Sequence, residues 1–461
     1  MGVHQAVETT VSDRRRVFIV LEKIVTKFGG SSLADDEQFK KVRSILELEP
    51  ARRYLVPSAP GKRFKEDEKV TDLLYRCQAL AAQGKDFNSE FAKIVDRYVS
   101  IARGLKLDTE ITGRLEEVRA GIAAGKNKDW VASRGEYLNG LLMADYLGWR
   151  FVDAAEGIRF DENGNLDAEK TQELLSSILA DGVPAVVPGF YGANEKGEVV
   201  TFSRGGSDIT GALVARAVNA DVYENWTDVS GFLMADPRIV DNPAEIGSIT
   251  YKELRELSYM GASVLHEEAM FPVHRAGIPT NIRNTNKPYH PGTVICLNAT
   301  NELTISVPTI TGIAGHKGYT SISVEKPMMN SELGFGRKVL QLFEEHGVSF
   351  EHMPTGIDNL CVVVETASIK HCRDEILTCL TEMAGEVGSV TVHDNLSIIA
   401  TVGRGMVHNC GTAARLFSAM SKARINVRMI DQGSSELSII VGVDDKDFEA
   451  TIKAIYHEFV G

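Results

Sequence analysis

The chain has 461 residues, a net charge of −13, and ordinary fractions of apolar (43%) and charged (25%) residues. This length provides two to three domains with buried cores, and the acidic balance excludes nucleic acid or an anionic membrane as the main partner, since both need a basic face. No apolar run approaches the ~18 residues of a membrane span, and the six cysteines follow no disulfide or metal spacing, which favours reduced thiols in a cytoplasmic protein.

Residues 1–22 are interpreted as an N-terminal extension without a signal peptide, because their apolar run is too short. From residue 24 to about 298, short apolar runs alternate with helical patterns. Strands are predicted at 24–28, 151–153, 184–188 and 221–226, and helices at 35–48, 132–147, 167–179 and 207–218. This alternation predicts an α/β fold with a mostly parallel sheet sandwiched by helices, whose ligands bind beyond the carboxyl ends of the strands.

An internal repeat follows residue 298. A shift of 77 residues places 425–427 on 348–350, Gly433 on Gly356 and Leu437 on Leu360. We predict two copies of a small α+β module that pack together, each with a first strand entered at the Val-Ser-Phe or Ile-Asn-Val segment. The predicted domains are therefore 23–300, 301–390 and 391–461.

Two glycine-rich loops stand between predicted strands and helices: 27–32 (Lys-Phe-Gly-Gly-Ser-Ser) and 203–208 (Ser-Arg-Gly-Gly-Ser-Asp). Glycines let backbone N–H groups approach a phosphate, and a helix start adds positive charge. Either loop alone would be interpreted as a tight turn, whereas two loops with adjacent cations and hydroxyls favour anion binding. The spacing required for a P-loop or a dinucleotide fingerprint is absent.

Together with 133–136 (Ser-Arg-Gly-Glu), 226–228 (Trp-Thr-Asp) and 236–238 (Asp-Pro-Arg), these loops resemble the aspartokinase family in residue type, order and spacing. The resemblance covers roughly residues 23–461. It implies an amino-acid kinase fold followed by two ferredoxin-like ACT regulatory domains. The implied reaction transfers the γ-phosphoryl group of MgATP to the β-carboxylate of L-aspartate, the first step of lysine, threonine and methionine biosynthesis.

An ionised carboxylate needs no general base, so catalysis here rests on positioning and charge stabilisation. The resemblance implies catalytic roles for Lys27, which stabilises the transferring phosphoryl group, and Asp208, which organises Lys27 or metal-bound waters. The implied substrate-binding residues are Ser58, Thr71, Glu136, Arg204, Gly206 and Ser207. Arg204 suits bidentate capture of the α-carboxylate, and Glu136 suits the α-ammonium group.

The implied ATP-binding residues are Gly29, Gly30, Ser31, Thr227, Asp228, Leu233, Arg238 and Ser263. The first three are expected to donate hydrogen bonds to the phosphoryl group. Ser263 stands where many family members have a lysine that reaches the phosphates, and Leu233 where a tyrosine is common. Arg238 and Lys62 are both candidates for the missing cation. Phosphate oxygens and water, rather than a protein metal site, are expected to hold Mg²⁺.

In the first ACT module, the positions that match the effector pocket of lysine-regulated relatives are Met329, Ser331, Phe335, Gly336, Ser349 and Glu351. Core packing is a competing explanation for Met329 and Phe335. Lysine, threonine or both are the expected feedback effectors, and Glu351 replaces the usual aspartate. ACT pairing between chains implies a homodimer, or a tetramer built from it.

Two alternative functions stay open. A related kinase acting on glutamate is disfavoured by Glu136 and the repeat. A catalytically silent amino-acid sensor is suggested by Ser263 together with the repeat. A bifunctional kinase–dehydrogenase is not expected, because nothing follows Gly461 that could form a dinucleotide domain.

Overall fold

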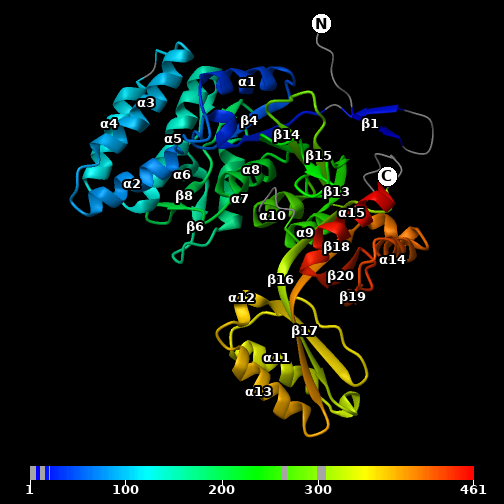
Figure 1. The fold of residues 1–461 in the computed structure, drawn as a ribbon. Helices are drawn as coiled ribbons and strands as arrows, with labels where there is room; N and C mark the ends of the chain where they lie inside the picture. Colours follow the sequence, from blue (N-terminus) through cyan, green and yellow to red (C-terminus); the bar gives the residue numbers. More distant parts are fainter. Residues whose placement is uncertain (1–6, 11–15, 20, 109, 262–266, 298–307) are drawn as a thin grey trace. The chain divides into compact units, whose positions relative to one another are not determined.

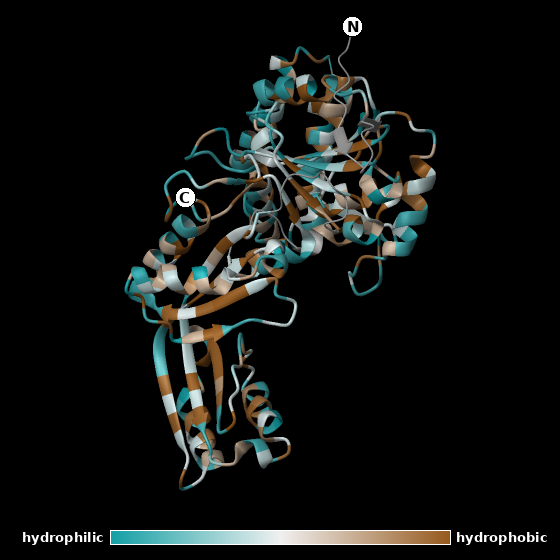
Figure 2. Cartoon of the chain, turned by 90° about the vertical axis from the view of Figure 1, so that its right-hand side faces the viewer, coloured by the Kyte–Doolittle hydropathy of each residue, from teal (hydrophilic) through white to brown (hydrophobic). Residues whose placement is uncertain are grey.

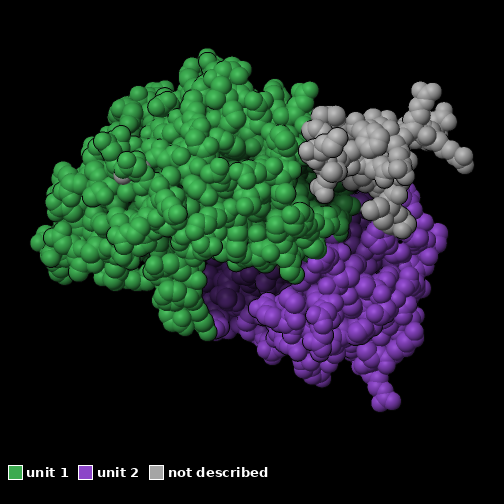
Figure 3. Space-filling view, turned by 90° about the horizontal axis from the view of Figure 1, so that it is seen from above, with its two compact units in different colours: residues 1–232, 247–251, 264–305 green, residues 233–246, 252–263, 306–461 purple. Residues whose placement is uncertain are grey.

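The computed structural model describes all residues except 1–6, 11–15, 20, 109, 262–266 and 298–307. The chain divides into two compact units, which have different colours in Figure 3. Unit 1 comprises residues 1–232, 247–251 and 264–305, and unit 2 comprises residues 233–246, 252–263 and 306–461.

The centre of unit 1 is an eight-stranded sheet. Its strands lie in the order β13 (Ser248–Thr250), β15 (Thr293–Cys296), β14 (Thr280–Asn284), β10 (Val222–Thr227), β3 (Ile24–Phe28), β4 (Arg52–Pro57), β7 (Ala185–Val186) and β5 (Arg150–Phe151). All neighbouring strands are parallel except β14 and β15. Every residue of β3 is buried, as expected for a parallel sheet covered on both faces. The predicted mostly parallel sheet is confirmed.

Helices cover both faces of this sheet (Figure 1). They are α1 (Asp36–Glu47), α2 (Val70–Ala82), α3 (Asn88–Gly104), α4 (Ile111–Ala123), α5 (Lys128–Leu147), α6 (Ala154–Gly157), α7 (Ala168–Ile178), α8 (Gly206–Ala217) and α10 (Glu267–Ala276), with the 3₁₀ helix η1 (Gly30–Leu33). Helices α1 to α5 share one hydrophobic core with Phe28 and Trp226. Neighbouring residues of a strand face opposite ways, so α8, which contacts Lys27 and Asn225, covers the other face.

The remaining elements of unit 1 are short strands. A hairpin joins β1 (Val7–Thr10) to β2 (Arg16–Ile19) within the predicted N-terminal extension, and β6 (Arg159–Phe160), β8 (Tyr191–Asn194) and β9 (Val199–Thr201) form a three-stranded sheet. No helices are predicted over 70–123, where the structure has α2, α3 and α4. These helices form a helical insertion between β4 and α5, so no neighbouring strand marks them in the sequence.

The main sheet of unit 2 is antiparallel. Its five strands lie in the order β17 (Asn359–Glu365), β16 (Gly312–Glu325), β18 (Ser389–Val402), β20 (Ser438–Asp444) and β19 (Met429–Asp431). Brown apolar residues alternate with white and teal ones along its long strands (Figure 2). The other elements are α9 (Tyr251–Tyr259), α11 (Phe335–Glu345), α12 (Thr366–Ile369), α13 (Arg373–Ala384), α14 (Thr412–Lys422), α15 (Phe448–Phe459), η2 (Met329–Ser331), η3 (Arg404–His408), η4 (Asp445–Asp447), β11 (Phe232–Leu233) and β12 (Glu245–Ile246).

The 77-residue repeat is confirmed by helix positions. Helices α11 and α14 begin at Phe335 and Thr412, and each follows a glycine in the left-handed region, Gly334 with φ 80° and Gly411 with φ 87°. The strand predicted at 348–350 is wrong: those residues are coil, and the first bridge joins His352 to Val363. Val348 instead donates its N–H to the Phe343 carbonyl and closes the end of α11.

Strands β16 and β18 run through both modules. The first part of β16, up to His316, pairs with the end of β18, whereas the part from Tyr319 onward pairs with the beginning of β18 and with β17. The register shifts between these parts, and Asn395 on β18 adopts a positive φ of 58°. The predicted boundary between 390 and 391 falls inside β18.

Among the described residues, no helix has both the length and the apolar character needed to cross a bilayer. All six cysteines are free thiols, of which Cys410 is exposed.

Candidate active site

Lys27 and Asp208 meet at the carboxyl end of β3. The register pairs Lys27 with Asn225 on β10, so both side chains leave the sheet on the face that α8 covers. Lys27 Nζ lies 2.7 Å from Asp208 Oδ1, and Asn225 Nδ2 donates to the same oxygen at 2.7 Å. The two side chains of the ion pair are only 10% and 15% exposed. The predicted catalytic pair therefore lies together, with Lys27 held in place by Asp208.

The first glycine-rich loop turns from β3 into η1. Gly29 donates its N–H to the Trp226 carbonyl at 3.0 Å, so the amide that is predicted to donate to the phosphoryl group is bonded within the protein in this structure. A Cβ at this position would make only ordinary van der Waals contacts, 3.8 Å from Lys27 Nζ. Within the described chain, the N–H groups of Gly30 and Ser31 have no protein acceptor. These two amides are the free donors of the loop.

The segment 58–69 packs against this loop. Gly61 donates its N–H to the Gly30 carbonyl at 2.8 Å, and Ser58 donates its N–H to the Phe28 carbonyl at 3.1 Å. A Cβ on Gly61 would lie 2.6 Å from the Gly30 carbonyl carbon, so glycine is required at this crossing. Asn139 Nδ2 donates to the Ser58 carbonyl at 2.6 Å and fixes the start of the segment. Thr71 lies just beyond its end, in the first turn of α2.

Glu136 on α5 points its carboxylate toward the same segment. The side chain is buried, its Oε2 has no hydrogen-bond partner among the described residues, and its other polar interactions include the backbone N–H of Ala59. Burial raises the pKa of Glu136 to about 8, because the charged form is desolvated. A buried carboxyl group without a cation is the arrangement expected for one whose partner arrives with a ligand.

The second glycine-rich loop leads into α8. Gly205 has φ 58°, and a Cβ on Gly206 would collide with Phe190 at 2.7 Å, so both glycines are needed. Ser207 lies against Gly189, whose own N–H donates to the Pro57 carbonyl, one residue before Ser58. Arg204 is exposed, and no ion pair engages it within the described chain. The loop thus brings Ser207 to the start of the 58–69 segment and leaves the Arg204 guanidinium available.

The predicted ATP-binding residues fall in both units. In unit 1, Thr227 ends β10 and its hydroxyl donates to Asp228 Oδ1 at 3.2 Å, while Asn284 Nδ2 donates to the Asp228 carbonyl. In unit 2, Leu233 is 36% exposed, and Arg238 pairs with Asp236 at 2.6 Å with its own side chain 88% exposed. Ser263 lies outside the described residues.

The predicted effector residues lie around η2 and α11 in unit 2. Met329 and Phe335 are buried in the hydrophobic core of the first module, as the competing explanation requires. Ser331 and Ser349 are exposed, and Gly336 is partly exposed in the first turn of α11. Glu351 Oε2 accepts a hydrogen bond of 2.5 Å from the hydroxyl of Tyr259, the last residue of α9.

The polar residues that position these groups are not among those predicted from the sequence. Asn225 supports Asp208, Asn139 supports Ser58, and Arg97 on α3 contacts the 58–69 segment. Asn225 left a signal, because asparagine and glutamate interrupt an otherwise apolar strand at 222–227. Asn139 and Arg97 left none, since polar residues on a helix are ordinarily solvated.

Comparison with known proteins identifies the class. The amino acid kinase family matches residues 22–284, and an ACT domain matches residues 399–459. The chain therefore belongs to the amino acid kinase family.

The most similar relatives narrow this class. Aspartokinase 3 of Bacillus subtilis is 40% identical over 452 residues, covering 94% of this chain and 98% of that protein. The crystal structure of Clostridium acetobutylicum aspartate kinase matches with a TM-score of 0.87 at 51% identity, covering 95% of this chain and 100% of the other. Escherichia coli aspartokinase III, solved with aspartate and ADP, matches with a TM-score of 0.69 at 25% identity over the same shares. Within its family the chain is an aspartokinase, and its activity is that of an aspartate kinase.

Proposed function

We propose that Lys27, Glu136 and Arg204 are the groups of this chain that carry out phosphoryl transfer from ATP to the β-carboxylate of L-aspartate. Arg204 binds the α-carboxylate, Glu136 binds the α-ammonium group, and Ser58, Thr71, Gly206 and Ser207 complete the substrate site. Lys27, oriented by Asp208, stabilises charge on the transferring phosphoryl group, and the Gly30 and Ser31 amides donate to its oxygens.

The single observation that carries this assignment is the buried Glu136 carboxyl group with an unpartnered oxygen. A substrate ammonium group supplies the missing cation and the missing donor together. This favours an α-amino acid as the substrate over a carboxylic acid that lacks the amino group.

On the nucleotide side, we propose that Gly29, Thr227, Asp228, Leu233, Arg238 and Ser263 contribute to ATP binding. Among the described residues, no group of three acidic, histidine or cysteine side chains could hold a metal ion, and Asp208 is already paired with Lys27. We propose that Mg²⁺ is bound through phosphate oxygens and water, where the ion neutralises phosphate charge.

We also propose that lysine is the feedback effector and binds beside Ser331, Gly336, Ser349 and Glu351. An E. coli aspartokinase III structure that contains lysine and aspartate matches this chain with a TM-score of 0.69 at 25% identity. Threonine stays the alternative effector. The carboxylate of Glu351 suits the ε-ammonium group of lysine, whereas threonine offers no side-chain cation.

A homodimer formed through the ACT modules completes the proposal. Several large apolar side chains in the modules are exposed: Met328, Leu333, Phe350, Ile357 and Ile430. Exposed apolar groups of this kind favour association with a second copy. Sedimentation of the purified protein over a range of concentrations tests the dimer.

Free thiols support a reducing, cytoplasmic location.

The decisive experiment measures ATP turnover with L-aspartate or L-glutamate, with hydroxylamine to trap the acyl phosphate. Aspartate-dependent hydroxamate, suppressed by lysine, is the expected result. Turnover with glutamate alone would support the related kinase. Amino-acid binding by calorimetry without any turnover would instead support the silent sensor, and suppression by threonine alone would reassign the effector.

A further inference from the structure

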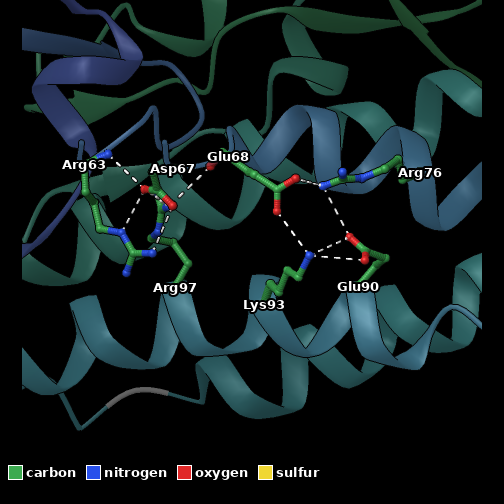
Figure 4. Close-up of polar contacts among 7 residues, drawn as sticks. All are labelled: Arg63, Asp67, Glu68, Arg76, Glu90, Lys93 and Arg97. Carbon is green, nitrogen blue, oxygen red and sulfur yellow. Dashed lines mark hydrogen bonds and ion pairs between the residues drawn. The ribbon is translucent and has the colours of Figure 1, made fainter. Parts of the chain in front are cut away.

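Arg97 is a buried arginine of α3 that forms a hydrogen bond and an ion pair with the 58–69 segment. The residue is 3% exposed, its Nη1 donates to the Gly61 carbonyl at 2.6 Å, and its Nη2 lies 2.5 Å from Asp67 Oδ2. Figure 4 shows both Arg97 and Arg63 next to the Asp67 carboxylate, and Arg63 Nε donates to Oδ2 at 2.9 Å. The fork geometry of guanidinium lets one side chain bind a carbonyl and a carboxylate at once.

The 58–69 segment contains no helix or strand. Hydrogen bonds from side chains must therefore fix the backbone conformation that helix or strand hydrogen bonds would fix elsewhere. Gly61, the fourth residue of the segment, contacts Arg97 through its carbonyl. Through its N–H it contacts Gly30 of the first glycine-rich loop (27–32), which is called the phosphate loop below. One peptide unit away, Pro60 accepts the N–H of Val70 at 3.3 Å, which ties the segment to the start of α2. Arg97 thus binds the part of the segment that contacts both α2 and the phosphate loop.

The ends of the segment carry proposed substrate contacts. Ser58 and Ala59 begin it, the backbone of Ala59 interacts with the Glu136 carboxyl group, and Thr71 follows it on α2. Displacement of a binding group by about 1 Å can cost 10²-fold in rate. A residue that fixes Gly61 therefore controls the aspartate site without contacting aspartate.

We propose that Arg97 is a positioning residue for the aspartate-binding segment and the phosphate loop of this kinase. This inference rests on the proposed substrate site. Arg97 differs from an ordinary structural ion pair because Asp67 keeps Arg63 as a partner when Arg97 is removed, whereas the Gly61 carbonyl loses a buried, charged donor.

A neighbouring cluster provides a matched control. One turn earlier on α3, Lys93 bonds to Glu68 at 3.1 Å and to Glu90 at 3.1 Å, and Arg76 joins the same cluster (Figure 4). Their side chains are 22–48% exposed, and exposed pairs of this kind contribute little. None of the four bonds to Gly61. Lys93→Met removes one exposed bond to the Glu68 side chain near the end of the segment, but Glu68 keeps Arg76 as a partner and the bond from Arg97 to Gly61 is unchanged.

The first test compares Arg97→Met, Arg97→Lys and Lys93→Met in steady-state kinetics. For Arg97→Met we expect the aspartate KM to rise about tenfold and kcat to fall, while the ATP KM changes less than about twofold. Arg97→Lys should lie between wild type and Arg97→Met, because lysine keeps the charge but loses the fork. Lys93→Met should match wild type. An unchanged aspartate KM in folded Arg97→Met would overturn the proposal.

Chemical rescue separates positioning from a general loss of stability. A cavity of about 370 Å³ lined by Arg63, Asp67, Leu73, Ala92 and Arg97, among others, adjoins the guanidinium. In Arg97→Ala, millimolar guanidinium should lower the aspartate KM toward the wild-type value, whereas equal concentrations of sodium or urea should not. Equal effects of all three additives would contradict the positioning role of Arg97. Failure of wild type to use aspartate at all would instead reject the proposed function.

Discussion

At the scale of single residues, two carboxyl groups of the site have opposite surroundings. Asp208 has a cation and an amide donor within hydrogen-bond distance, whereas Glu136 has a buried oxygen with no partner. Asp208 therefore has its partners before substrate binds, whereas the free oxygen of Glu136 gains a partner only when substrate binds. This difference predicts which kinetic constant each residue controls.

Replacing Glu136 by glutamine should raise the aspartate KM by about 100-fold, since the ammonium group loses its counter-ion. The wild-type aspartate KM should fall as pH rises through the Glu136 pKa of about 8, because only the ionised carboxylate attracts the ammonium group. Initial rates at several pH values, with saturating ATP, measure both effects.

The same substitution has an expected effect on stability. The pKa of Glu136 is about 8 in the folded protein and 4.5 in its usual range, so the folded state binds more protons than the unfolded chain between these values. The unfolding free energy of wild type should therefore fall as pH rises through this window, and Glu136→Gln should flatten that dependence. Urea titrations of the ligand-free proteins check this, and parallel curves would contradict the assigned burial effect.

Replacing Lys27 by methionine should lower kcat by about 10²- to 10³-fold, because the transferring phosphoryl group loses a preorganised cation. The variant should also lose stability, since Asp208 is left buried without its cation. The double variant Lys27→Met/Asp208→Asn should regain stability but not kcat. Recovery of kcat in the double variant would show that Lys27 serves only to balance Asp208. Stopped assays and thermal melts of the three proteins distinguish these results.

At the scale of elements, local sequence patterns predict the positions of several helices and strands correctly. Strand β3 and helices α1 and α8 lie where apolar runs and glycine-rich turns placed them. The strand predicted at 348–350 is wrong because the alternating Val-Ser-Phe pattern, which here follows the end of α11, resembles the start of a strand. The partners of Lys27 were only half predictable, since Asp208 is in a motif whereas Asn225 depends on the register of two distant strands.

Helix α9 contacts both ACT modules through its side chains. Within unit 2, its Glu253 is fully buried and binds the Thr311 hydroxyl at 2.6 Å and Arg404 Nη1 at 2.8 Å. Its last residue, Tyr259, donates its hydroxyl to Glu351. An effector ammonium group must therefore compete with Tyr259 for the Glu351 carboxylate.

Replacing Tyr259 by phenylalanine should strengthen inhibition by lysine about threefold to tenfold, because Glu351 no longer has to give up a hydrogen bond. Dose–response curves at fixed aspartate and ATP concentrations measure the change, with activity in the absence of lysine unaffected. Tyr289→Phe is the matched control, since that tyrosine is 80% exposed and lies in unit 1. Unchanged or weaker inhibition in Tyr259→Phe would reject the competition.

At the scale of the whole molecule, the two ACT modules are nested rather than consecutive. The core of the second module contains Ile313 and residues from Ile399 onward, and the core of the first lies entirely between Ile322 and Val392. No residue from 318 to 396 belongs to the second core. The two modules thus share strands but not cores.

Replacing residues 318–396 with an Asn-Gly turn should therefore leave the second module folded, because a two-residue turn can join the paired strands. The shortened protein should keep a cooperative thermal transition and lose lysine binding, as measured by calorimetry. Removal of α14 from the second core is the contrasting deletion and should abolish cooperative melting of that module. Aggregation of the first variant with loss of its transition would show that the cores depend on each other.

The nesting also has a consequence for synthesis on the ribosome. His316 pairs with Ile398, so the first strand of the second module leaves the ribosome about 80 residues before its partner. Closing so long a loop is slow and entropically costly for a disordered chain. The first module can fold in that interval, since its core needs no later residue, and it then brings the two ends of the loop together. The first module therefore brings the two paired strands of the second module together during translation, as a tight turn does in an ordinary hairpin.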